Sequence, residues 1–249
     1  GDGLVKIGKD GIVLEGMPTD MIDGGSQNFL NFTTDGTYVY GVNMSRNIFV
    51  IDPTQYKVVD IIRTKPETGF VSIAYDHNKN GVWCSDNSGL NVWFVDKDGN
   101  VYDGREQDDI RLETLDQYII VGLAYDDITE GGPYLWTAIQ GLEFTDNVAR
   151  IGRFHIESGE YDPFVIDAKE GAGIYPVNGS MMGGIYSYMD FSKKKFILSG
   201  IFSSQHKLFG FDMSDITEAK TPRRVSNFSL TTNKNDGLKV GLSWINPFK

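Results

Sequence analysis

The sequence predicts an all-β protein, a β-propeller of about five four-stranded blades. Three observations predict this fold. A strand–turn–strand pattern recurs along the chain, its copies follow one another at similar intervals, and one copy is split between the two ends. Four short antiparallel strands every ~45 to 60 residues are typical of propeller blades. We therefore expect residues 1–249 to form a single propeller domain. A two-sheet sandwich has similar strands but gives no reason for this period.

The two clearest copies of the pattern share a nearly identical first strand. Residues 72–76 read Ser-Ile-Ala-Tyr-Asp, and residues 122–126 read Gly-Leu-Ala-Tyr-Asp. Both copies continue with runs rich in Val, Ile, Phe, Tyr and Trp, a composition typical of strands. The pair Asp98–Gly99 separates two such runs and favours a tight hairpin, because glycine accepts positive φ. No window of ~12 residues has helical periodicity, so we expect few helices.

The spacing of the copies predicts how the ring closes. The position after the third strand falls at residues 8, 52, 96, 155 and 212. The intervals are 44, 44, 59 and 57 residues, and 45 when the count runs from residue 212 through the C-terminus to residue 8. Residues 4–14 resemble only the second half of a copy, so we expect the N-terminal strands to complete the last blade. The C-terminus supplies this blade either with two strands, from residues 230–241, or with one, from residues 240–244.

The composition argues against several classes of partner. The net charge is −11 and the pI is about 4.7, whereas nucleic-acid binding needs a basic surface. No apolar run approaches the ~18 residues of a membrane-spanning helix. The single cysteine, Cys84, lies in a strand-like run, so we expect a buried, inert thiol and no internal disulfide.

Aspartates recur at two positions of the pattern. They follow the first strands and the third strands at Asp76, Asp126, Asp190, Asp52, Asp96 and Asp212. A ring of carboxylates around a central channel would be a functional interpretation. Because Asp side chains accept hydrogen bonds from backbone N–H groups in tight turns, we interpret the series as structural.

The sequence predicts no catalytic residue, no metal site and no cofactor. The histidines His77, His155 and His206 lack the spacing of a zinc site. His155 stands where other copies have aspartate, which favours a role at the strand end. No Gly-x-Ser-x-Gly motif is present, and the glycine pairs lack the Gly-Lys-Ser/Thr of a phosphate-binding loop. These observations favour a non-catalytic protein over an enzyme.

Residues 72–102 and 122–161 resemble the YVTN/NHL-like group of bacterial β-propeller repeat proteins. The resemblance extends at blade level over nearly the whole chain and implies the propeller fold. It also implies an extracytoplasmic location, which means periplasmic, cell-surface or secreted. Members of this group are often binding or scaffold proteins and many are uncharacterised, so the resemblance implies no particular activity.

Two enlarged intervals predict where a binding site lies. Residues 140–147 and 167–180 are connections too long for the pattern, and in propellers both types of connection project from one face. Loops carry function more often than the scaffold that supports them. The candidate binding residues are Gln140, Phe144, Tyr175, Met181, Met182 and His206. An alternative is that Phe144 and Tyr175 only cover the mouth of the channel.

Three functions remain open from the sequence. The first is a binding or scaffold propeller whose ligand is an unknown protein or carbohydrate. The second is a hydrolase, lactonase or glycosidase with a site in the central channel. The third is a lectin-like propeller with one shallow sugar site per blade, which the unequal copies disfavour.

Overall fold

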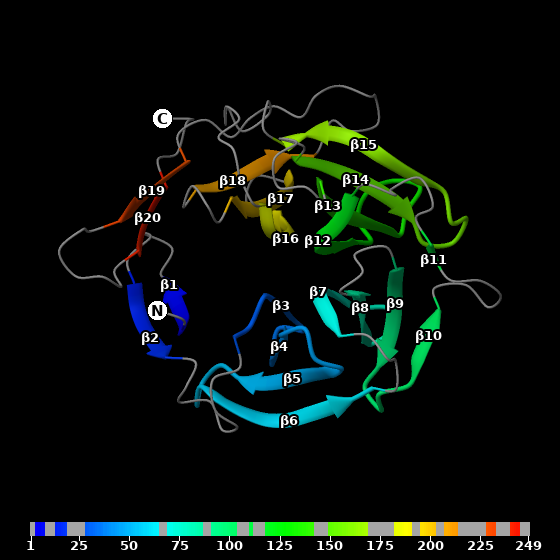
Figure 1. Cartoon of the computed structure of the whole chain (residues 1–249). Helices are drawn as coiled ribbons and strands as arrows, with labels where there is room; N and C mark the ends of the chain where they lie inside the picture. Colours follow the sequence, from blue (N-terminus) through cyan, green and yellow to red (C-terminus); the bar gives the residue numbers. More distant parts are fainter. Residues whose placement is uncertain are drawn as a thin grey trace.

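The computed structural model describes residues 3–7, 13–18, 28–64, 69–86, 91–103, 110–111, 118–141, 149–168, 182–190, 195–202, 207–213, 228–232 and 240–244. All elements in these residues are β-strands, which confirms the predicted all-β class. Figure 1 shows the sheets arranged around a central axis as the blades of a propeller.

Each blade is an antiparallel sheet of strands that follow one another in the chain. Blade 1 contains β3 (Asn31–Thr34), β4 (Val39–Val42), β5 (Asn47–Asp52) and β6 (Lys57–Arg63). Blade 2 contains β7 (Phe70–Asp76), β8 (Gly81–Asp86), β9 (Asn91–Asp96) and β10 (Val101–Asp103), and β11 (Ile110–Arg111) also pairs with β9. Blade 3 contains β12 (Tyr118–Asp126), β13 (Tyr134–Gly141), β14 (Ala149–His155) and β15 (Tyr161–Asp167). Blade 4 contains β16 (Met182–Asp190), β17 (Lys195–Phe202) and β18 (Lys207–Asp212).

The described residues form four blades, so the predicted number of about five is corrected. The innermost strands β3, β7, β12 and β16 contact one another in turn, and β16 also contacts β3. Four inner strands therefore surround the axis (Figure 1). Spacing along the sequence counts strand pairs, but it does not reveal which of them reach the axis.

The two ends of the chain form two small sheets instead of one four-stranded blade. β1 (Gly3–Ile7) pairs with β2 (Val13–Pro18), and β19 (Phe228–Thr232) pairs with β20 (Val240–Trp244). Both sheets lie on the same side of the ring, between the outer parts of blades 4 and 1 (Figure 1). β2 contacts β20, but within the described residues no ladder of hydrogen bonds joins the two sheets. The C-terminus has two strands, of which the second, Val240–Trp244, lies where the one-strand alternative was predicted.

The core is divided among the junctions between blades. Three clusters of buried apolar side chains lie between blades 1 and 2, blades 2 and 3, and blades 3 and 4. Trp83 and Trp136, both fully buried, belong to the second and third of these clusters. The junction between blades 4 and 1 instead contains a groove, described below.

The aspartates after the first strands hold the hairpins together, as the structural interpretation predicts. Asp76 Oδ1 accepts hydrogen bonds from the backbone N–H groups of residues 78 and 79, and its Oδ2 accepts one from Trp83 Nε1 at 3.0 Å. Asp126 repeats the arrangement, with Trp136 Nε1 at 2.9 Å from its Oδ2. Both carboxylates are 1 % exposed, so they lie inside blades and do not form a reactive ring.

Groups that follow the third strands have the same structural role. Asp52 accepts hydrogen bonds from the backbone and hydroxyl of Thr54. His155 Nδ1 accepts a hydrogen bond from the Ser158 N–H at 2.8 Å, and its Nε2 lies 2.7 Å from the Gly131 carbonyl oxygen. The predicted strand-end role of His155 is therefore confirmed.

The Asp52 turn predicts an acid-dependent loss of stability. Hydrogen bonds from the Thr54 hydroxyl and N–H lower the pKa of Asp52 below its ordinary value of 3.8. A carboxyl group whose pKa is lower in the folded state stabilises the protein at pH values above its unfolded-state pKa. This contribution to the free energy of unfolding is lost as the pH falls through the folded-state pKa. We expect the urea midpoint of Asp52→Asn to depend less on pH than that of the unmodified protein, between about pH 5 and pH 3. Asp60→Asn, which changes an exposed side chain on β6, is the control. Parallel curves of urea midpoint against pH for Asp52→Asn and the unmodified protein would contradict the prediction.

Candidate functional site

A groove lies between the inner strand of blade 1 and the outward face of blade 4. Side chains alternate between the two faces of a strand, so blade 4 has two different surfaces. Ile185, Leu198 and Phe211 pack against blade 3. Tyr186 and Ser199, their neighbours in the sequence, line the groove.

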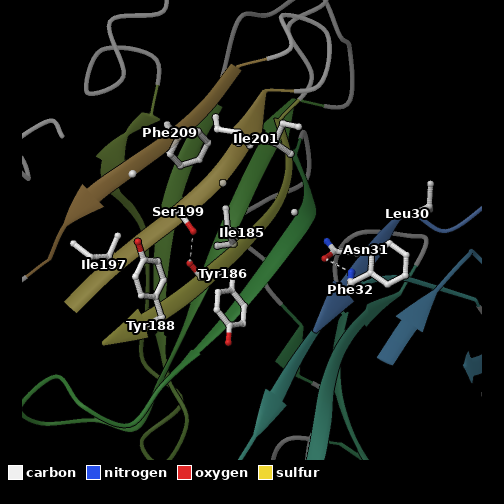
Figure 2. A pocket seen from close by; sticks show the side chains of 14 residues that line it. Leu30, Asn31, Phe32, Ile185, Tyr186, Tyr188, Ile197, Ser199, Ile201 and Phe209 are labelled. Carbon is white, nitrogen blue, oxygen red and sulfur yellow. Dashed lines mark hydrogen bonds between the residues drawn. The ribbon is translucent and has the colours of Figure 1, made fainter. Parts of the chain in front are cut away.

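The groove has a volume of about 510 Å³, within the range of ~300–1,000 Å³ typical of small-molecule sites. Leu30, Asn31 and Phe32 form the wall from blade 1, and Figure 2 shows them across the groove from Tyr186 and Tyr188. Ile197, Ile201 and Leu208 add an aliphatic surface on the side of blade 4. None of the described side chains that line the groove is charged.

Two tyrosines dominate the wall from blade 4. Tyr186 and Tyr188 are two residues apart on β16, with ring centroids 6.4 Å apart and planes inclined by 21°. Figure 2 shows the rings side by side with their hydroxyl groups pointing in opposite directions. Tyr186 is 42 % exposed, and its hydroxyl has no hydrogen-bond partner in the described part of the chain. Burial raises the pKa of Tyr186, so the phenol is neutral at physiological pH.

Asn31 brings a fixed amide to the opposite wall. Its Nδ2 donates to the Val121 carbonyl at 3.3 Å, and its Oδ1 accepts from the Phe32 N–H at 2.9 Å. On its other side lies Gly184, where an added Cβ would be 2.7 Å from Asn31 Oδ1. Contacts with three blades therefore hold Asn31, and the second hydrogen of its amide remains for another acceptor.

The residues predicted from the sequence lie elsewhere or outside the described part. Gln140 is 2 % exposed within β13, where it faces Ile119 and Ala149 in the strand register. Met182 begins β16 and pairs in register with Phe202. The other four, Phe144, Tyr175, Met181 and His206, are outside the described residues. The predicted site on the long connections therefore remains a prediction.

The described residues that line the groove do not belong to the long connections on which the sequence predicts a binding site. A signal was present in the diverged fourth copy. Its first strand has tyrosines at positions 186 and 188, whereas the first strand of blade 2 has the small residue Ala74 near the corresponding point. Two aromatic side chains on one face of a strand indicate a surface that a neighbour or a ligand covers.

Other reactive groups among the described residues do not form a centre. Cys84 is fully buried, and burial raises the pKa of its thiol, as expected for an inert cysteine. Among the described residues, no group of three His, Cys, Asp or Glu side chains is arranged to hold a metal ion. The same residues include no helix of the length and hydropathy needed to cross a membrane.

Comparisons with known proteins show the fold and no family. No family model and no curated protein matches the chain. A crystal structure of a nidogen/laminin complex matches with a TM-score of 0.52 and 11% identity, over 93% of this chain and 81% of that one. The structure of streptogramin B lyase matches with a TM-score of 0.48 and 13% identity, over 97% and 72%. U3-55K matches with a TM-score of 0.41 and 9% identity over 77% of this chain, which spans 50% of that one.

Proposed function

We propose that this protein is a non-catalytic binding propeller that holds an uncharged, partly apolar ligand in the groove between β3 and blade 4. The observation that carries the proposal is the tyrosine-lined space of about 510 Å³ at the junction of blades 4 and 1. The other three junctions are filled by apolar clusters. An apolar pocket with a few fixed polar groups is the usual form of a small-molecule site.

The lining supports an uncharged ligand. Its described polar groups are phenols, a hydroxyl and an amide, all of which are neutral. Transfer of an unpaired charge from water into such a site costs several kcal/mol. The net charge of −11 also repels anions from the whole surface.

The chemistry of the lining also supports a non-catalytic role. General acid–base catalysis works best with groups whose pKa lies near the working pH. Burial moves the pKa of the Tyr186 phenol upward, away from that range. Ser199, the hydroxyl on β17, donates its hydrogen to the backbone carbonyl of Tyr186 at 3.2 Å and has no histidine beside it among the lining residues.

Binding of a neutral apolar dye tests the proposal. Nile red should bind with enhanced fluorescence, and Leu30→Asp should weaken its binding about tenfold because a carboxylate at the rim opposes desolvation. Leu30 is 50 % exposed, so the substitution should leave the fold intact. Val59→Asp, at an aliphatic side chain that is 49 % exposed on β6, is the matched control. Equal affinities for the two variants would reject the groove as the binding site.

A further inference from the structure

We infer that the ligand of the groove is a neutral carbohydrate, one sugar ring of which stacks on the exposed ring of Tyr186, with Tyr188 beside it. This inference rests on the proposed function and specifies its ligand. The two rings are nearly parallel, with planes inclined by 21° and centroids 6.4 Å apart, and both line the groove, so they give a sugar a platform of aromatic surface (Figure 2). The platform faces open space in the groove.

The chemistry of a sugar matches this platform. A pyranose ring has a face of C–H groups and a rim of hydroxyl groups. The C–H groups carry a small positive charge and are attracted to the negative face of an aromatic ring. Removal of water from both surfaces adds a hydrophobic contribution that scales with the buried area.

The hydroxyl rim of a sugar needs hydrogen-bond partners, which the groove supplies from both walls. On the side of blade 4, the Tyr186 hydroxyl has no hydrogen-bond partner among the described residues. The Asn31 amide lies on the opposite wall, where the Val121 carbonyl and the Phe32 N–H fix its orientation. An amide fixed before binding loses little side-chain entropy when it meets a ligand.

The same features disfavour other neutral or amphipathic ligands. A fatty acid needs a cation for its carboxylate, and the described lining contains neither lysine nor arginine. A purely apolar ligand would leave the Asn31 amide hydrogen without an acceptor.

Calorimetric titration with a panel of neutral hexasaccharides tests the inference. The panel contains the β-1,4-glucan, α-1,4-glucan, β-1,4-xylan and chitin hexamers, with a hexamer of galacturonic acid as the charged comparison. At least one neutral hexamer should bind, and Tyr186→Ala should weaken its binding about tenfold. Tyr186→Phe keeps the stacking surface and should lose less affinity for the hexamer than Tyr186→Ala. Tyr102→Ala, at a tyrosine that is 50 % exposed on β10, should leave binding unchanged.

The outcomes separate the inference from the proposed function. Absence of binding to every neutral hexamer, or binding that Tyr186→Ala leaves unchanged, overturns the carbohydrate inference. Tighter binding of the galacturonic acid hexamer overturns it as well. If Nile red still binds and Leu30→Asp still weakens that binding, the groove remains a ligand site for another neutral molecule. Loss of both results removes the proposed function together with the inference.

Discussion

Replacement of Trp136 by alanine is expected to lower the free energy of unfolding by about 4 kcal/mol. Trp136 is fully buried in the apolar cluster between blades 3 and 4, so its removal leaves a large cavity. The substitution also removes the indole N–H that donates to Asp126 Oδ2 at 2.9 Å. A buried carboxylate that loses a donor adds to the cost of the cavity. Urea unfolding followed by circular dichroism at pH 7 measures the change.

A pair of tryptophan-to-phenylalanine substitutions separates the hydrogen bond from the packing. Trp136→Phe removes the indole N–H and retains much of the aromatic volume, so we expect a loss of about 2 kcal/mol. Trp93, whose side chain is partly exposed, is the comparison, because its Nε1 is buried without a hydrogen-bond partner in the described part of the chain. Trp93→Phe should therefore lower the free energy of unfolding clearly less than Trp136→Phe does. Equal losses for the two variants would show that the bond to Asp126 contributes nothing specific to the blade.

The strands and hairpins of blades 1 to 3 follow from the sequence because their causes are local. Alternating apolar residues require one face toward a neighbour, and aspartates after a strand satisfy the N–H groups of the turn. The Asp98–Gly99 pair forms the predicted turn, with Gly99 at a φ of +82°. The likeness of residues 72–76 to residues 122–126 predicts the shared arrangement of Asp76 with Asp126.

The number of blades does not follow from the sequence, because closure depends on contacts between distant strands. β16 meets β3 where Gly184 lies against the Asn31 side chain, and no periodicity links these two residues. The two end segments are strands, as their likeness to half-copies predicts, but they pair within themselves. Spacing alone does not distinguish a strand pair that completes a sheet from one that lies beside it.

The groove is hidden from the sequence for a related reason. Its two walls come from residues 30–32 and from residues 184–210, which are more than 150 residues apart in the chain. Long connections with aromatic residues predict a site at Phe144 and Tyr175. Both residues are outside the described part of the chain. Tyr186 and Tyr188 become candidates only when the fold places them on the wall of the groove.

Both proposals require that solvent and small molecules reach the groove. The rate at which a cysteine on its wall reacts with a maleimide measures this access. Cys84 is the protein's single cysteine and is fully buried, so it gives a slow internal reference for labelling. Ser199→Cys places a thiol of nearly the same size on the groove wall of β17. Ser158→Cys places one in an exposed turn of blade 3 and gives the fast reference.

Labelling of these two variants with a neutral maleimide under native conditions tests the central claim most directly. An open groove predicts that Ser199→Cys reacts within about tenfold of the rate of Ser158→Cys and at least ~100 times faster than Cys84. Saturating Nile red should slow the labelling of Ser199→Cys and leave the labelling rate of Ser158→Cys unchanged. If Ser199→Cys reacts as slowly as Cys84, the face of blade 4 is covered by protein, and the groove is not a ligand site.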